Sequence, residues 1–232
     1  MLITNTTTTT NPTAMLRLMQ LVSPMLPVGA YSYSQGLEWA VQSGWVHDEA
    51  SAAEWLQGLM THNLGQLDVP VLARLHQAWR RSDREAVDYW SALLHASRES
   101  AELQNEDRQL GWALARVLNE LEIGEAQHWL LHPAASFANL FALAAAVWNI
   151  SLEETCLGYL WAWSENQTSA AMKLIPLGQS AGQRLLSRAI ETIPAIVQSG
   201  LRVSDDEIGA FTPGLALASA CHETQYTRLF RS

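Results

Sequence analysis

The chain has 232 residues, of which 48% are hydrophobic and 16% charged, and its formal net charge is −9. An acidic chain without a basic stripe does not fit a nucleic-acid binder, and two cysteines without a CxxC pattern suit a reduced protein. A chain of this length can bury a large core without disulfides or a metal. The low charge and the ten tryptophans indicate that another chain covers part of the surface.

The first residues, MLITNTTTTTNPTA, predict a disordered leader over residues 1–14. They show neither the basic start nor the apolar stretch of a signal peptide, so we expect a cytoplasmic protein. The rest, residues 15–232, is predicted to form one all-helical domain. The longest apolar run, FANLFALAAAVW, is too short to cross a bilayer and contains Asn139, so it predicts a buried helix.

The segment SPMLPVGAYSYSQGLEWAV, residues 23–41, interrupts the helical pattern. Prolines, including Pro27, end the preceding helix, and Gly29 permits an unusual backbone conformation. Loops that carry aromatic residues are often interaction loops. Tyr31 and Tyr33 could equally fill the core beneath a packed loop, and the sequence leaves both interpretations open.

Helical periodicity dominates the remainder of the chain. Capping boxes are predicted to start three helices: Ser51 with Glu54, Ser82 with Glu85, and Ser151 with Glu154. Asp68 is predicted to cap a fourth helix, with Pro70 in its first turn. One buried stripe is predicted from residues at helical spacing: Leu103, Leu110, Leu114, Val117 and Leu121. Because alternating strand patterns are nearly absent, we predict an all-α fold, a single globular domain of about ten helices.

One pentapeptide resembles a catalytic motif. GQSAG, residues 178–182, fits G-x-S-x-G with Ser180 as nucleophile. The residues that could complete a triad follow in the order seen in α/β-hydrolases: Asp205 or Asp206, then His222. That fold needs a parallel sheet, however, and Pro176 would lie inside its nucleophile strand. The alternative is the start of a helix, where small residues allow close packing. We therefore expect no enzyme, with a serine hydrolase as the alternative hypothesis.

Nucleotide and metal sites are weakly indicated. The only lysine, Lys173, lies in SAAMKLIPL and cannot complete a Walker A loop. His128 and His132 could share a helical face with Glu125, but a proline follows directly. The second candidate, Cys221–Glu223, holds adjacent residues that point in different directions on a helix. Both fit ordinary helix-end or surface residues better, so we expect no metal or cofactor bound by the chain.

Three segments together resemble the UreF family of urease accessory proteins. The family's N-terminal signature corresponds to Pro27–Glu38, and its second signature to Ala171–Gln183. The ending HETQYTRLFRS, His222–Ser232, is similar to the family's C-terminus, and a helix between the signatures contains the pair Leu110–Gly111. The resemblance extends from about Leu16 to Ser232.

This resemblance implies a non-enzymatic, all-α homodimer that acts as a scaffold or chaperone in nickel insertion into urease. It implies that the chain binds UreD, also called UreH, recruits and modulates the GTPase UreG, and docks on apo-urease. Nickel and nucleotide then belong to the partners, and GQSAG is part of a family signature. Two departures are the polar Glu165 and Asn166 before Lys173, and HPAASFANL, which lacks the glycine expected after its proline.

The final segment, TQYTRLFRS, is predicted to bind UreD. Helical spacing would place Tyr226 and Phe230 on one side, with Leu229 beside them, and Arg228 and Arg231 on another side. Apolar anchors and arginine forks suit ordering against a partner. The alternative is that the tail folds back onto its own domain and completes the core.

Two further groups are predicted to contact partners. A lone lysine in a chain that otherwise uses arginine offers a compact, hydrated charge, and the resemblance makes Lys173 and Gln179 candidates for binding UreG. The candidate interaction loop contributes the following residues: Pro27, Gly29, Tyr31 and Tyr33.

Overall fold

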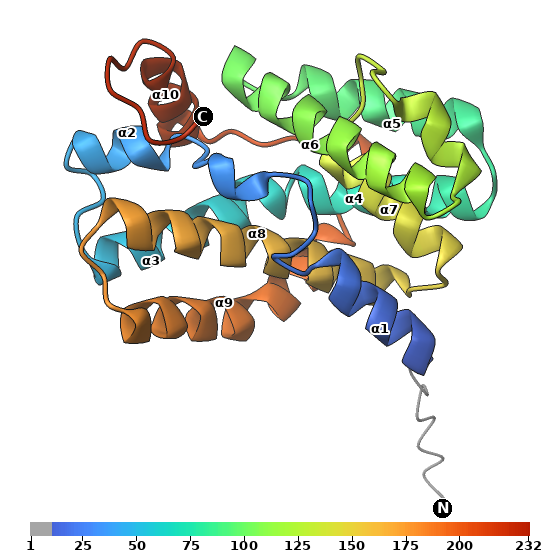
Figure 1. Cartoon of the computed structure of the whole chain (residues 1–232), viewed down its shortest axis with the longest axis horizontal. Coiled ribbons are helices and arrows are strands. Elements are labelled where there is room, and N and C mark those ends of the chain that lie inside the picture. The colour runs from blue at the N-terminus through green and yellow to red at the C-terminus, as the bar shows by residue number, and fades with distance from the viewer. Residues whose placement is uncertain (1–10) are drawn as a thin grey trace, which may run out of the picture.

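The computed structural model describes residues 11–232 (Figure 1). Within these residues the chain forms ten α-helices joined by short turns, and no strand. The predicted all-α fold of about ten helices is therefore confirmed. The first helix begins at Pro12, inside the last residues of the predicted leader. Residues 1–10 lie outside the described part, so the remainder of the leader stays a prediction.

The α-helices are α1 (Pro12–Leu21), α2 (Leu37–Gln42), α3 (Glu49–Leu59), α4 (Asp68–Arg80), α5 (Arg84–Ala96), α6 (Ala101–Glu120), α7 (Phe137–Val147), α8 (Leu152–Leu174), α9 (Gln179–Gly200) and α10 (Pro213–His222). Four short segments complete the list: the 3-10 turns η1 (Ala30–Ser32), η3 (Gly124–Trp129) and η4 (Asp205–Glu207), and the π-helical turn η2 (Met60–Leu64).

Local capping starts several helices, although not always at the predicted residue. The Ser151–Glu154 capping box of α8 is confirmed. The box predicted for α3 is wrong, because Asp48 caps that helix and Ser51 is its partner three residues later. The box predicted for α5 is wrong by one residue, because Asp83 accepts from the backbone of Ala86. In both cases an aspartate upstream of, or next to, the serine serves as an equally good cap.

Asp68 was predicted to cap α4, and this is wrong because its carboxylate has stronger partners. Arg98 binds both oxygens, at 2.7 and 3.0 Å, and Tyr159 donates to one of them at 2.9 Å. The same arginine donates to Asp107 at 3.0 Å. Asp68 is therefore the first residue of α4 and part of a buried ionic cluster that joins α4, α6 and α8. Such a cluster is tolerated in a core only when its charges are paired and hydrogen-bonded.

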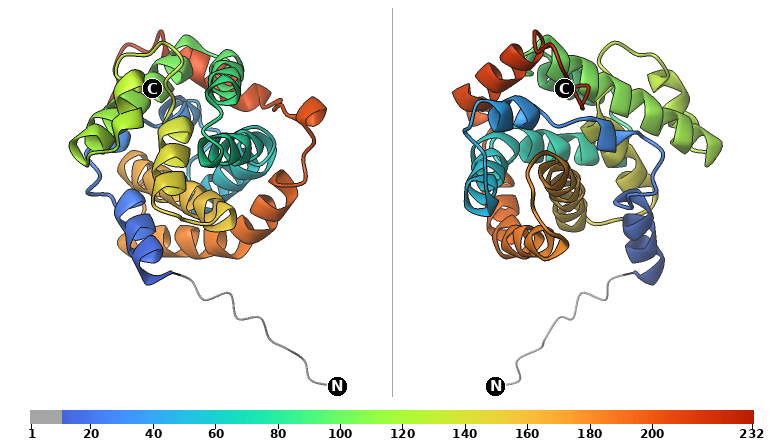
Figure 2. Two further views of the ribbon diagram at one scale, coloured as in Figure 1. Left: turned by 90° about the vertical axis from the view of Figure 1, so that its right-hand side faces the viewer. Right: turned by 60° about the vertical axis from the view of Figure 1, so that its left-hand side comes forward.

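The core is built around α7, as the apolar run predicted. Figure 2 shows α7 inside the molecule, and it packs against α4, α6 and α8. Its Asn139 is buried and accepts from Trp79 Nε1 at 2.8 Å. A Cβ on Gly111 of α6 would lie 2.8 Å from the backbone nitrogen of Ser136, so α6 approaches the start of α7 too closely for any side chain there.

The predicted stripe of α6 is partly correct. Leu103, Leu110 and Leu114 are buried, but Val117 is half-buried and Leu121 is 40% exposed. Leu118 takes the inward place instead, because a spacing of four follows the 3.6-residue period better at this point than a spacing of three.

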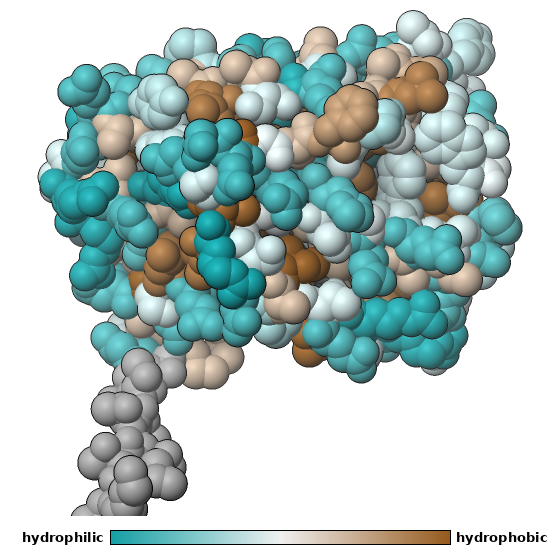
Figure 3. Space-filling model, turned by 180° about the vertical axis from the view of Figure 1, so that it is seen from behind, coloured by the Kyte–Doolittle hydropathy of each residue, from teal (hydrophilic) through white to brown (hydrophobic). Residues whose placement is uncertain are grey.

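The remaining helices pack around this core. The long helices α8 and α9 lie side by side along the lower edge of Figure 1, and α2 and α10 meet at the upper left, next to the end of the chain. Figure 3 shows the opposite face, where hydrophobic residues form separate spots among hydrophilic ones. No helix in residues 11–232 is both long enough and apolar enough to cross a bilayer.

Candidate functional site

Three segments that are distant in the sequence meet at one surface. The ammonium of Lys173, in the last turn of α8, lies 5.9 Å from the ring centre of Tyr31 and 5.5 Å from that of Phe230. These distances are within the range of cation–π attraction. The candidate interaction loop, the lone lysine and the tail are therefore parts of one site.

The tail, residues 223–232, is not helical, so the predicted helical arrangement of its side chains is wrong. The helix α10 ends at His222, and turns and extended residues follow. The physical reason is that the tail's backbone groups bond to other segments. Glu38 of α2 accepts from the backbone nitrogens of Leu229 and Phe230 at 2.7 and 2.8 Å, and Arg231 donates to the carbonyl of Ser32 at 2.8 Å.

Ser232 and Phe230 attach the tail to the domain. The carbonyl of Ser232 accepts from both the backbone nitrogen and the hydroxyl of Ser34, at 2.7 and 2.6 Å. Phe230 is only 6% exposed and belongs to a hydrophobic cluster that includes Leu37, Ile175 and Leu185. The tail thus folds back onto its own domain at these two residues, as the intramolecular alternative proposed.

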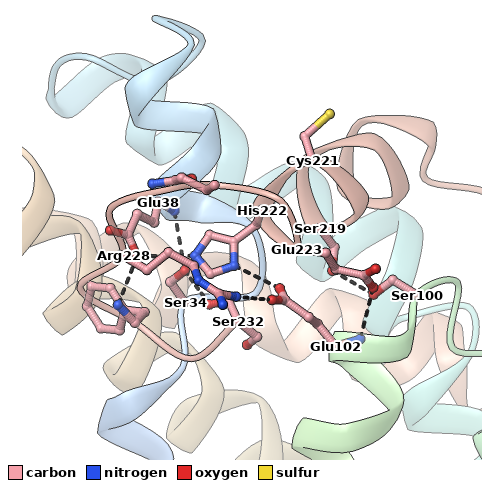
Figure 4. Close-up of polar contacts among 12 residues, drawn as sticks. Ser34, Glu38, Ser100, Glu102, Ser219, Cys221, His222, Glu223, Arg228 and Ser232 are labelled. Atoms are coloured by element: carbon pink, nitrogen blue, oxygen red, sulfur yellow. Dashed lines mark hydrogen bonds and ion pairs between the residues drawn. The ribbon is translucent and has the colours of Figure 1, made fainter.

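His222 is the centre of a buried network of charged groups, which Figure 4 shows in detail. Its Nδ1 lies 2.8 Å from a carboxylate oxygen of Glu102, and its Nε2 lies 3.2 Å from one of Glu38. The ring of His222 therefore bridges carboxylates of two different helices, α2 and α6. Arg228 donates to the other oxygen of Glu102 at 2.7 Å. Glu102 therefore contacts both His222 and Arg228.

This network leaves no triad for Ser180. Both ring nitrogens of His222 are engaged by carboxylates of other helices, and Asp205 pairs with Arg74 at 2.8 Å. The pentapeptide instead starts α9, as the alternative interpretation predicted, and Ser180 is exposed in its first turn. A Cβ on Gly182 would lie 2.3 Å from the sulfur of Met172, so this glycine permits close packing of α9 on α8.

Glu106 is a functional candidate that the sequence did not reveal. It is buried on α6 next to a cavity of about 110 Å³, and it bonds with the hydroxyl of Ser232 and with Gln35 Nε2. Burial raises the pKa of Glu106 to about 7, although the hydrogen bonds from Ser232 and Gln35 act in the opposite direction. A carboxyl group that titrates near neutrality therefore supports the tail.

The signal for these acidic partners was weak in the sequence. Glu38 and Ser34 lie inside the N-terminal signature, but nothing local connects them with residues near position 230. Glu102 and Glu106 occupy one face of an ordinary amphipathic helix. Only the approach of α2, α6 and the tail makes their carboxylates partners of the tail.

The predicted site residues differ in how far their side chains are exposed to solvent. Tyr226 is fully exposed, Leu229 is 65% exposed and Tyr31 is 68% exposed. Tyr33, by contrast, is buried, so the two tyrosines of the loop divide between the two interpretations that the sequence left open. The remaining predicted residues on the surface are Pro27, Lys173, Gln179, Arg228 and Arg231, and Gly29 adopts a left-handed backbone with φ 79°.

The candidate metal ligands do not form a larger cluster. No group of three or more histidine, cysteine, aspartate or glutamate residues within residues 11–232 is arranged to hold a metal ion. The rings of His128 and His132 are 5.1 Å apart, and burial, with a further contribution from His128, lowers the pKa of His132. Cys221 points away from the network of His222 in Figure 4.

Comparison with known proteins gives one consistent result. Residues 46–190 match the family model for UreF. A protein of Alkalilimnicola ehrlichii is 54% identical, with 97% of this chain and 99% of the relative covered. Proteins of Hahella chejuensis and Chromohalobacter salexigens are each 47% identical, covering 95% and 96% of this chain and 99% and 96% of the relatives. All three are named urease accessory protein UreF.

Proposed function

Because the chain belongs to the UreF family of urease accessory proteins, we propose that it is a non-enzymatic scaffold for maturation of the urease nickel centre. In this role it is a cytoplasmic homodimer that binds UreD (UreH), recruits and modulates the GTPase UreG, and docks on apo-urease as a chaperone of nickel insertion. Nickel and nucleotide are handled by its partners. The name shared by the relatives supports the assignment to urease maturation.

The observation that carries the proposal is the joint surface of loop, lysine and tail. It presents Tyr31, Tyr226 and Leu229 to solvent, and Phe230 and the network of His222 hold the tail from beneath. Exposed tyrosines and arginines are the side chains that dominate binding energies in protein interfaces. A surface assembled from three distant segments, with these side chains exposed, is suited to binding another protein.

We assign the two sides of this surface to different partners. Tyr226, Leu229 and the arginines of the tail contact UreD, whereas Phe230 acts inside the domain as the anchor of the tail. Lys173, Gln179 and Tyr31 contact UreG. Pro27 and Gly29 set the path of the loop, and Tyr33 fills the space beneath it.

The test is a double variant, Tyr226→Ala with Leu229→Ala, expressed with the other proteins of the urease cluster. Both side chains are exposed, so the variant should keep its helical content and melting temperature. Loss of one good interface anchor costs about 2 kcal/mol, which lowers affinity about thirtyfold. The variant should therefore fail to co-purify with UreD and should not activate urease. Tyr89→Ala, which removes an exposed tyrosine from α5, is the matched control.

Normal co-purification and urease activation by the double variant would contradict the assignment of the tail. Activation of urease in cells without this chain would contradict the proposed function itself. The two failures are therefore distinguishable.

A further inference from the structure

A second surface lies between the α4–α5 turn and the end of α7, at the far right of Figure 1, away from the tail. It encloses a groove of about 490 Å³. The groove is lined by Trp79, Arg80, Ser82, Arg84, Glu125, Leu143, Ala146, Val147 and Asn149. None of these residues belongs to the surface described above.

Within residues 11–232, the arginines of this groove have no carboxylate partner. In the part of the chain that the structure describes, the ion pairs of arginine involve Arg74, Arg98, Arg184, Arg188 and Arg228 only. Arg80 and Arg84 therefore form no ion pair with any of the described residues, although the chain contains 23 acidic residues. A guanidinium group that is left unpaired in an acidic protein is available for an anion from outside.

Neighbouring groups hold both arginines in place. Arg80 donates to Asn149 Oδ1 at 3.1 Å, and the guanidinium carbon of Arg84 lies 5.6 Å from the ring centre of Trp79. The indole of Trp79 is itself fixed by its hydrogen bond to Asn139. Each guanidinium keeps further N–H groups for a ligand. Holding the donors in place before binding reduces the entropy lost on binding.

The floor of the groove is apolar. Leu143, Ala146 and Val147 come from the last turns of α7, and Val147 is 43% exposed. Glu125 offsets one of the two positive charges, so the groove has a small positive excess. A simple inorganic anion would bind the arginines but would make no contact with this apolar floor. A ligand that uses both must combine carboxylates with apolar side chains.

We propose that this groove binds an acidic segment of a partner protein. Carboxylate side chains of the segment pair with Arg80 and Arg84, and an apolar side chain between them lies on Val147 and Trp79. Nucleic acid does not fit, because the chain as a whole carries a net charge of −9.

The test uses the full chain, labelled with ¹⁵N on its tryptophans, and an acetylated and amidated peptide that alternates glutamate and leucine. The indole signal of Trp79, assigned from Trp79→Phe, should shift and saturate as the peptide is added. The same peptide with glutamine in place of glutamate should not shift it. Arg80→Gln with Arg84→Gln should weaken the binding about tenfold or more. Arg116→Gln, which removes an exposed arginine from α6, should bind as the wild type does.

Three results would overturn the proposal. The first is equal binding of the glutamate and glutamine peptides, and the second is undiminished binding by the double variant with normal helical content. The third is displacement of the peptide by an equal concentration of inorganic phosphate, which would mean a simple anion site without use of the apolar floor.

Discussion

The strongest single prediction concerns Glu106, because its titration affects the stability of the fold in a defined direction. Its pKa is about 7 in the folded protein, against an ordinary value of 4.5. Between these two pH values the unfolded chain has released the proton while the folded protein still holds it. Stability falls with rising pH wherever the folded state binds more protons. The stability that the neutral Glu106 contributes to the folded protein is therefore lost as the pH rises from about 4.5 to about 7, and it is absent at higher pH.

Above about pH 7 the wild type must bury an ionised carboxylate at position 106, which lowers its free energy of unfolding. Glu106→Gln removes this cost because the amide does not ionise, and it keeps the local hydrogen bonds. The amide oxygen can accept from Gln35 and the amide nitrogen can donate to the hydroxyl of Ser232. The difference between the two pKa values corresponds to roughly 3 kcal/mol. At pH 8 the variant should be more stable than the wild type by up to this amount, or by roughly 10 °C in melting temperature. At pH 4 the two proteins should be nearly equal.

The assay is urea unfolding followed by circular dichroism at several values between pH 4 and pH 8.5. Glu191→Gln, on the exposed side of α9, is the control and should follow the wild type at every pH. The reasoning is refuted if the difference between Glu106→Gln and the wild type is the same at pH 5 and pH 8. In that case Glu106 does not hold its proton in the folded protein.

Three further predictions follow from packing and contacts. Phe230→Ala should lower the free energy of unfolding by about 3 kcal/mol or more, since the ring is buried; an unchanged urea midpoint would show that the ring does not pack in the core. Gly111→Ala should cost about 1–3 kcal/mol, because its Cβ would meet the backbone at Ser136, whereas Gly124→Ala has open space and should be neutral in the same assay. Lys173→Ala should keep the melting temperature but weaken recruitment of UreG in a pull-down, and Lys173→Arg should retain part of it; full recruitment by Lys173→Ala would contradict the role of the lysine.

Features that depend on neighbouring residues in the sequence could be predicted from the sequence. The helical period and the Ser151 capping box are local, and they gave the all-α class and the start of α8. The errors at α3 and α5 are also local in origin, because Asp48 and Asp83 are alternative caps within three residues of the predicted serines. Local rules identify a helix start but do not choose between adjacent caps.

Features that depend on distant residues could not be predicted in this way. Asp68 has the sequence signature of a cap, but Arg98 and Tyr159 bind its carboxylate from other helices. The side-chain spacing of the tail fits a helix, but Glu38 accepts hydrogen bonds from the backbone N–H groups of Leu229 and Phe230 and holds the tail in a non-helical conformation. Hydrogen bonds between residues distant in the sequence decided both cases.

The tail can both fold back onto its own domain and bind a partner, because only its two ends are held by the domain. The network of His222 holds one end of residues 223–229, and Phe230 with Ser232 holds the other. Tyr226 and Leu229 are thus exposed on a loop whose ends are held. A loop held in this way loses less conformational entropy when a partner binds it. The intramolecular contacts of the tail should therefore contribute to the affinity that we propose it has for UreD.

Glu38→Gln tests this coupling without changing any exposed side chain of the tail. One amide oxygen cannot replace two carboxylate oxygens that accept from Leu229, Phe230 and His222. The tail should become more accessible, which trypsin cleavage after Arg228 measures. Calorimetric titration with UreD should show a weaker affinity, by about tenfold if the loss equals one charge-assisted hydrogen bond. Faster cleavage with an unchanged affinity would mean that UreD orders the tail itself, because the contacts within the chain would then contribute nothing to binding.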